Sequence, residues 1–319
     1  MFLYYTDNGS TFFVLLMYYF SLNDQHLCAA IVGIYAFFFR QTNIVWVVFT
    51  AGVTAVRILE PAVLTKLGRH SNQSLKLVAE FSRQIFCNLK TVVCTLWPYA
   101  LVMVFFGAFL FFNGGIAVGD KMHHQVCFNF PQIFYFACFA TFFSLSHLSS
   151  PAVLHDVYIF ALSLTRRHYH SMLILIIFAM YYLIQNHTHV HPYLLADNRH
   201  YTFYVWKNVF KAHPEMKLAL IPVYLAALTT MFVAIDCSCL WKIVYGVCVS
   251  AVLIPQGLLE FRYFILPYLM FRLHLRRTET WKLAAEFFLY AAVNFFTMWA
   301  FLNKTFKWPN SPDVQRFMW

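Results

Sequence analysis

Long apolar runs separated by short polar turns make up most of this 319-residue chain. Val92 to Phe112 contains no charged residue, and neither does Leu218 to Ile235. A run of about 20 such residues crosses a bilayer core of about 30 Å as a helix with its backbone hydrogen bonds satisfied internally. The pattern predicts an all-α polytopic integral membrane protein with about ten transmembrane helices. We expect these helices near residues 2–22, 27–39, 44–58, 92–112, 130–148, 171–185, 218–235, 241–256, 258–273 and 284–302.

Composition agrees with this interpretation, since only 11% of the residues are charged, whereas soluble domains carry about 25%. The chain shows no internal repeat and no soluble segment, so we expect a single multi-pass membrane domain over residues 1–319. An excess of 23 basic over 13 acidic residues suggests nucleic-acid binding in a soluble protein. In a membrane protein it indicates basic cytosolic loops instead.

Basic residues gather in three turns, at residues 57–90, 166–167 and 272–282. If these turns lie in the cytosol, as basic loops usually do, alternation of the helices places a second set of segments on the opposite face. These segments are residues 1–9, 40–43, 113–129, 186–217 and the C-terminus.

Four clusters of polar side chains, all assignable to that opposite face, are the candidate functional residues. A charge at the bilayer centre costs about 2.5–3.5 kcal/mol, so a charged residue near the membrane needs a partner, a water-filled cavity or a function. In the first cluster, Asp7 lies at the edge of a predicted helix and is either a helix cap or a functional carboxylate. The second cluster contains Arg40, Gln41 and Asn43 in a short turn. Arg40 either extends to the membrane surface or binds a ligand, and the two amides suit sugar hydroxyls.

The third cluster, Glu260 and Arg262, lies in the stretch "LLEFRYFILPY". A spacing of two residues does not place both side chains on one helix face. A structural ion pair with other helices and a binding role both stay open. Pro267 is expected to kink the segment and open a cavity.

The fourth cluster, Asp197, Asn198, Arg199 and His200, is followed at once by Tyr201 and further aromatic residues. Interfacial anchoring explains the aromatic residues but not the four polar ones. An arginine offers a two-pronged donor, and a histidine adds another. Arg199 and His200 therefore suit a lipid-linked phosphate.

Other motifs point away from metal, nucleotide and transport chemistry. The triplet His187-x-His189-x-His191 has a spacing that suits a strand, and zinc or iron sites need three or four converging ligands, so we expect no metal. The chain has no P-loop, Rossmann glycine pattern or GxSxG motif. A transporter built on inverted repeats would show internal symmetry, which is absent.

Six uncommon stretches occur in order along the chain: "YYTDNGSTFF", "FRQTNIVWVVF", "NFPQIFYF", "LLADNRHYTFYVWK", "LLEFRYFILPY" and "FLNKTFKWPNSPDVQRFMW". With them the chain resembles the dolichyl-phosphate-glucose alpha-1,2-glucosyltransferase family of the endoplasmic reticulum. The resemblance implies a GT-C type fold in that membrane, with a lumenal active face. It also implies inverting transfer of the third and last glucose from dolichyl phosphate glucose to Glc2Man9GlcNAc2-PP-dolichol, the precursor of N-glycans.

The resemblance also implies roles for the four clusters. A carboxylate acts as general base on the acceptor 2-hydroxyl, with Asp197 and Asp7 as candidates. Cationic side chains stabilise the departing dolichyl phosphate, and no cofactor is needed. The expected substrate-binding residues are Arg40, Gln41, Asn43, Asn198, Arg199, His200, Tyr201, Glu260 and Arg262.

One departure from the family concerns the N-terminus. The family normally begins with a further membrane span and a lumenal loop carrying an acidic motif, and this chain starts downstream of them. We therefore interpret the chain as N-terminally truncated relative to the family. The alternative function is an inactive family member that binds and regulates another membrane protein, for example an ion channel.

Overall fold

The structure, a computed structural model, describes residues 7–67, 74–116, 127–164, 166, 169–276, 279–308 and 313–318. Residues 2–6 of the first predicted helix and the basic residues Arg69, Arg167 and Arg277 lie outside the described residues. The chain divides into two compact units, Met1–Gln125 with Cys237–Val252 and Val126–Asp236 with Leu253–Trp319. A single membrane domain over the whole chain stays a prediction.

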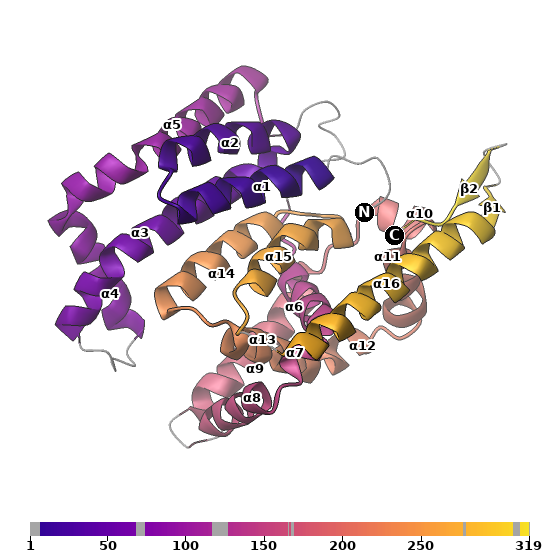
Figure 1. The fold of residues 1–319 in the computed structure, drawn as a ribbon. Helices are drawn as coiled ribbons and strands as arrows, with labels where there is room; N and C mark the ends of the chain where they lie inside the picture. Colours follow the sequence, from indigo (N-terminus) through magenta and orange to yellow (C-terminus); the bar gives the residue numbers. More distant parts are fainter. Residues whose placement is uncertain are drawn as a thin grey trace. The chain divides into compact units, whose positions relative to one another are not determined.

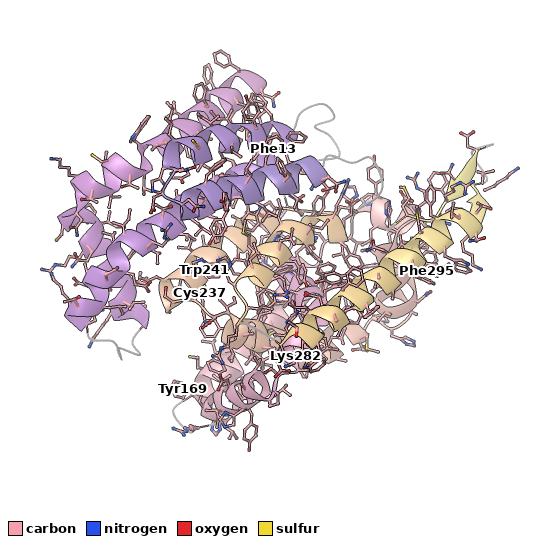
Figure 2. The ribbon with its side chains drawn as sticks, in the orientation of Figure 1. Phe13, Tyr169, Cys237, Trp241, Lys282 and Phe295 are labelled. Atoms are coloured by element: carbon pink, nitrogen blue, oxygen red, sulfur yellow. The ribbon has the colours of Figure 1, made fainter. Side chains whose placement is uncertain are left out.

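The described elements of the first unit are all helices, and short turns within the described residues connect some of them (Figure 1). Its elements are α1 (Asp7–Leu22), α2 (His26–Phe39), the 3₁₀ helix η1 (Gln41–Asn43), α3 (Ile44–Leu67), α4 (Ser74–Cys87), α5 (Leu89–Asn113) and α14 (Cys239–Leu253). α1 and α2 lie side by side (Figure 1), and the ring of Phe13 in α1 stacks on that of Tyr35 in α2 with 5.8 Å between the ring centres (Figure 2). In the core, Phe49 of α3 meets Trp241 of α14 edge to face at 5.7 Å. Aromatic pairs of this kind add to the apolar burial that holds α1, α2, α3 and α14 together.

The second unit contains the remaining helices and the described strands. Its elements are α6 (Pro131–Phe143), α7 (Leu145–Leu148), α8 (Pro151–Leu164), α9 (His170–His187), α10 (Pro192–Ala196), α11 (Tyr201–Val205), the π-helix η2 (Trp206–Lys211), α12 (Met216–Ala219), α13 (Ile221–Ala234), the 3₁₀ helix η3 (Phe261–Phe264), α15 (Ile265–Leu273), α16 (Thr280–Asn303), β1 (Thr305–Lys307) and β2 (Val314–Arg316). Phe134, Met180, Ile184, Ile221 and Tyr224 form a core between α6, α9 and α13.

A short hairpin follows α16 and ends the described chain. β1 and β2 pair antiparallel, with Thr305 opposite Arg316. The guanidinium of Arg316 donates from Nη1 to the backbone oxygens of Phe301 (3.1 Å) and Leu302 (3.3 Å). The last carbonyls of a helix lack internal partners, so Arg316 both satisfies them and fixes the hairpin to the end of α16.

Four helices in the described part are long and apolar enough to cross a membrane: Gln41–Leu67, Leu89–Asn113, Met216–Ala234 and Thr280–Asn303. The shorter apolar helices are His26–Phe39, Pro131–Phe143, Pro151–Leu164 and Cys239–Leu253. The helical membrane class is thus supported, while the count of about ten spans stays a prediction.

Local expectations differ from the structure at several places, among them α4 (Ser74–Cys87), which lies in the segment 57–90 that was expected to be a basic turn. Residues 258–273 were expected to form one helix, but they divide into an extended stretch, η3 and the nine-residue α15. Pro255 and Gly257 precede this break, and the residue before a proline disfavours helical geometry. α8 lies where no helix was expected. The sequence did not predict it because His155 and Asp156 interrupt the apolar run.

Candidate functional site

The polar loop between α10 and α11 is built around the carboxylate of Asp197. Arg199 donates from Nε to Oδ1 at 2.8 Å and from Nη2 to Oδ2 at 2.7 Å, and its backbone N–H also donates to Oδ1 at 3.1 Å. Two-pronged pairs of this kind are strong and fix the plane of the guanidinium. The loop therefore holds Arg199 in one orientation.

His200 completes this group, with Nε2 at 3.4 Å from Oδ2 of Asp197. Partial burial raises the pKa of Asp197, but hydrogen bonds from the side chain and backbone of Arg199, with the neighbouring His200, outweigh it and lower the pKa below its usual value. Asp197 is therefore a carboxylate at neutral pH. Its proximity to Arg199 and His200 gives the loop one guanidinium, one imidazole and one carboxylate within hydrogen-bond or ion-pair distance.

The C-terminal hairpin covers one side of this loop. The indole N–H of Trp308 donates to Oδ1 of Asn198 at 2.8 Å, and the guanidinium of Arg199 lies 4.9 Å from the centre of the Trp308 ring. The backbone N–H of Met318 donates to the carbonyl of Arg199 at 2.7 Å. Sequence reasoning quoted the hairpin stretch but assigned Trp308 no place in the site. The place of Trp308 in the site is visible only from its hydrogen bond to Asn198, a residue 110 positions away in the chain.

Tyr201 connects the loop to α16. Its hydroxyl lies 2.9 Å from Oγ1 of Thr297, and its ring meets Phe317 edge to face at 4.7 Å. This contact fixes the start of α11 and hence the end of the polar loop. The five predicted residues 197–201 thus lie in one arrangement, supported by α16 and by the hairpin.

Glu260 and Arg262 form an ion pair with each other. Glu260 has an extended backbone, and Arg262 lies in η3 with its guanidinium 5.4 Å from the ring of Tyr263. Because the residues around them are not α-helical, a spacing of two positions brings the side chains together. The structural ion pair left open by the sequence is local rather than one with other helices.

In the first unit, Nη2 of Arg40 lies 2.7 Å from Oδ1 of Asp7. Asn43 is 1% exposed and donates from Nδ2 to Oγ of Ser10 (2.7 Å) and to the carbonyl of Ala36 (2.8 Å). Both amide hydrogens of Asn43 are thus used within the protein, which indicates that it stabilises the turn. Gln41 begins the same turn. Binding roles for these residues stay predictions.

The histidine triplet has packing and capping contacts. His187 lies against the ring of Phe130 at 5.2 Å, and Nδ1 of His191 accepts from the backbone N–H of Tyr193 at 3.2 Å. Among the described residues, no group of three or more histidine, cysteine or acidic side chains is arranged to hold a metal ion. The absence of a metal from the reaction stays a prediction.

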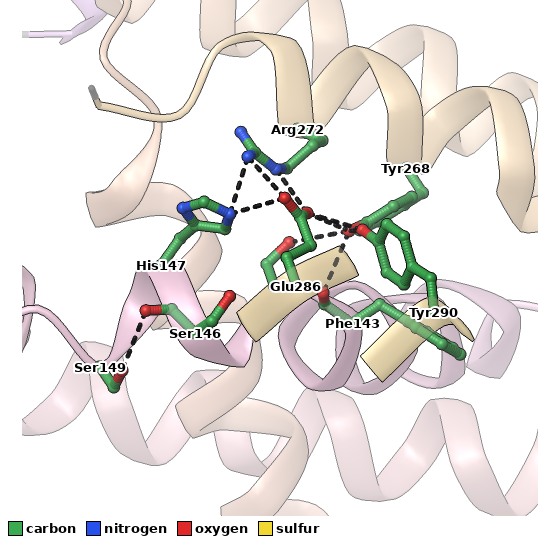
Figure 3. Close-up of polar contacts among 9 residues, drawn as sticks. Phe143, Ser146, His147, Ser149, Tyr268, Arg272, Glu286 and Tyr290 are labelled. Atoms are coloured by element: carbon green, nitrogen blue, oxygen red, sulfur yellow. Dashed lines mark hydrogen bonds and ion pairs between the residues drawn. The ribbon is translucent and has the colours of Figure 1, made fainter. Parts of the chain in front are cut away.

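A second polar cluster, which sequence reasoning missed, surrounds Glu286 of α16 (Figure 3). Arg272 of α15 donates from Nε to Oε1 at 2.6 Å and from Nη2 to Oε2 at 2.7 Å, and Tyr290 donates to Oε1 at 2.7 Å. Nε2 of His147 in α7 lies 2.8 Å from Oε2. Glu286 and His147 lay inside expected membrane helices, where a lone ionisable residue is itself a signal of structure or function.

Comparison with known proteins bears on the resemblance expected from the six sequence stretches. The model of the DIE2/ALG10 family matches residues 1–273. The chain is 42% identical to the Dol-P-Glc:Glc(2)Man(9)GlcNAc(2)-PP-Dol alpha-1,2-glucosyltransferase of Homo sapiens, over 100% of this chain and 69% of that protein. Proteins of the same name from Drosophila melanogaster and Arabidopsis thaliana are 34% and 31% identical, over 99% and 100% of this chain and 71% and 72% of theirs.

No solved structure matches the chain. The family match extends from the first residue through the polar loop to the end of α15, and the full-length relatives extend it through α16 and the hairpin. The expected resemblance is confirmed: the chain belongs to the DIE2/ALG10 family.

Proposed function

We propose that this chain is an inverting α-1,2-glucosyltransferase that adds the third and last glucose to the lipid-linked oligosaccharide Glc2Man9GlcNAc2-PP-dolichol, with dolichyl phosphate glucose as donor. The observation that carries the proposal is identity over the full chain to relatives with that activity in their names. Identity of this extent favours the enzyme over a non-catalytic regulator of another membrane protein.

The apolar helices suit substrates of this kind, because both dolichyl tails reside in the bilayer. We assign the chain to the endoplasmic reticulum membrane as a multi-pass protein, with the polar loop facing the lumen. A GT-C type fold with about ten spans belongs to the same proposal. The length and apolar character of four described helices support the multi-pass membrane assignment.

In the proposed reaction the acceptor 2-hydroxyl attacks C1 of glucose from the face opposite the phosphate. The new C1–O bond forms as the bond from C1 to the phosphate oxygen breaks, and the hydroxyl proton passes to a carboxylate. Dolichyl phosphate leaves as an anion and takes no proton. Cations held in place before the reaction stabilise that charge, which is the role we assign to Arg199 and His200.

Asp197 and Asp7 are the two candidates for the general base. Both oxygens of Asp197 accept hydrogen bonds from Arg199, which suits an orienting group better than a proton acceptor. Arg40 contacts Asp7 through Oδ1. We therefore assign Asp197 the role of orienting Arg199, and both Asp197 and Asp7 stay candidates for the base.

The amides and the second ion pair complete the proposal. Gln41, Asn43 and Asn198 suit sugar hydroxyls, although Nδ2 of Asn43 and Oδ1 of Asn198 already bond within the protein. Glu260 and Arg262 are further candidates for substrate contacts.

The test is complementation of cells that lack this glucosyltransferase, with the lipid-linked glycan analysed for its third glucose. The chain is compared with Arg199→Ala and with Arg166→Ala, a matched loss of an exposed arginine. Loss of one positioned donor in a transition state typically costs 10²–10³ in rate. We expect wild type and Arg166→Ala to restore the third glucose and Arg199→Ala to lose most of the activity.

The level of folded protein is measured in the same cells for each variant. Arg199→Ala at normal abundance without the third glucose supports the assigned role. Full activity of Arg199→Ala contradicts the role of the loop, and failure of the wild-type chain in purified form with both substrates contradicts the proposed function.

A further inference from the structure

A non-helical stretch, residues 254–260, separates the end of α14 from η3. It leads directly into Glu260 and Arg262. Helical backbone satisfies its own hydrogen bonds, but an irregular segment among apolar helices needs partners from elsewhere in the protein. The residues that supply these hydrogen-bond partners therefore fix the backbone conformation of residues 254–260.

Backbone groups of the segment before α6 supply the first partners. The N–H of Asn129 donates to the carbonyl of Ile254 at 2.9 Å, and the N–H of Cys127 donates to the carbonyl of Pro255 at 3.3 Å. These two bonds join the segment before α6 to the turn at residues 254–255. They hold the first half of the stretch.

Two side-chain amides hold the second half. Nε2 of Gln132 donates to the carbonyls of Gln256 (3.3 Å) and Leu258 (3.0 Å), and Nδ2 of Asn129 donates to the carbonyl of Gln256 (3.3 Å). Pro131 starts α6 between these two residues, so a helix N-terminus sets their positions. Asn129 and Gln132, three positions apart, both donate to the carbonyl of Gln256.

Both amides are buried, and only their N–H groups have hydrogen-bond partners among the described residues. Asn129 is 2% exposed and Gln132 is 1% exposed. Among the described residues, neither Oδ1 of Asn129 nor Oε1 of Gln132 has a hydrogen-bond partner. Burying such an oxygen costs free energy, whereas leucine or methionine would fill the space without that cost. The presence of amides at positions 129 and 132 is therefore explained by their N–H groups, which donate to the carbonyls of residues 256 and 258.

The last bonded carbonyl lies two residues before Glu260, and the N–H of Tyr263 donates to the carbonyl of Glu260 at 3.2 Å. The backbone that carries the Glu260–Arg262 pair is thus fixed on both sides. We propose that Asn129 and Gln132 are positioning residues, an amide clamp that holds residues 254–260 and so orients the Glu260–Arg262 pair. The catalytic consequence rests on the proposed function, whereas the clamp itself does not.

The first readout is hydrogen exchange of the purified full chain, in peptides that cover residues 254–264. Gln132→Met keeps the volume and removes both donors, and we expect exchange there to become at least several-fold faster. Thr141→Val is the matched control, since it removes a buried hydroxyl without a partner among the described residues from the same helix. It is expected to leave exchange in residues 254–264 unchanged. Asn129→Leu, which spares both bonds of Gln132, serves if Gln132→Met does not fold, and is expected to give a smaller increase.

The second readout is transfer kinetics, measured well below the melting temperature of each variant. We expect Gln132→Met to lower kcat/KM about 10–100-fold, as for a misplaced catalytic or binding group, and Thr141→Val to leave it unchanged. Unchanged exchange in folded Gln132→Met or Asn129→Leu overturns the clamp. Faster exchange with unchanged kinetics overturns its positioning role. A wild-type chain without transfer contradicts the proposed function, and the exchange result still decides the clamp.

Discussion

Asp197 and Glu286, two carboxylates of the second unit, are both held by a two-pronged arginine, but the two arginines connect different things. Arg199 lies two residues from Asp197, so that pair closes a short loop on itself. Arg272 comes from α15 and His147 from α7, so the contacts of Glu286 join three helices (Figure 3). One ion pair shapes a loop, and the other links the helices of a bundle.

Burial differs in the same direction. The side chains of Asp197 and Arg199 are 20% and 31% exposed, whereas those of Glu286 and His147 are 9% and 1% exposed. A partly exposed pair contributes little to stability, but breaking a buried pair leaves the other charge without compensation. The comparison teaches that similar arginine–carboxylate geometry shapes a partly exposed loop at Asp197 and joins packed helices around Glu286.

The largest expected effect comes from removing the charge at Glu286. Glu286→Gln leaves Arg272 next to a neutral amide in a half-buried position, and we expect the free energy of unfolding to fall by about 3–5 kcal/mol. The measurement is thermal and denaturant unfolding of the purified full chain in detergent.

Glu279→Gln is the control, because Glu279 is an exposed acid at the start of the same helix. It is expected to change stability by no more than about 0.5 kcal/mol. Replacing both partners, as Glu286→Leu with Arg272→Met, is expected to recover part of the loss, since no unpaired charge remains. Equal effects of Glu286→Gln and Glu279→Gln would contradict a bundle-linking role.

A smaller effect is expected where the hairpin meets the loop. Trp308→Phe removes the donor to Asn198 but keeps a ring beside Arg199, and it is expected to cost about 0.5–1.5 kcal/mol. Trp308→Leu also removes the ring and is expected to cost about 0.5–1 kcal/mol more. Protease sensitivity of residues 197–201 reports the release of the loop. Trp299→Phe, at an exposed position of α16, is the control, and equal sensitivity in both variants would show that the hairpin does not support the loop.

Sequence alone predicted the elements that depend on local pattern. The expected helix at 27–39 is α2 (His26–Phe39), and that at 218–235 contains α13 (Ile221–Ala234). The cluster at residues 197–201 also follows from its sequence, because Asp197 and Arg199 are close enough to pair in almost any turn. Apolar runs and short-range charge pairs carry this information without any knowledge of the fold.

Contacts between distant residues were beyond the sequence. His147 and Glu286 are 139 residues apart, and Asn198 and Trp308 are 110 residues apart. Their pairing depends on how the helices pack, which hydropathy does not encode. α8 shows the opposite kind of failure, in which the apolar pattern missed a helix. His155 interrupts that pattern, but its side chain is largely exposed at the helix surface and is therefore tolerated there.

The smallest expected effect is the pH dependence of the loop. The pKa of Asp197 is lowered in the folded protein, so the stability that it contributes is complete above its unfolded pKa, ordinarily 3.8, and is lost as the pH falls through the lower folded pKa. The difference in unfolding free energy between wild type and Asp197→Asn should therefore be constant near neutral pH and decrease as the pH approaches and passes 3.8. Thermal melts across this range measure it. In an Arg199→Ala background the same difference should shrink, because Arg199 supplies the hydrogen bonds to Asp197. A difference that persists in that background would assign the lowered pKa to other groups.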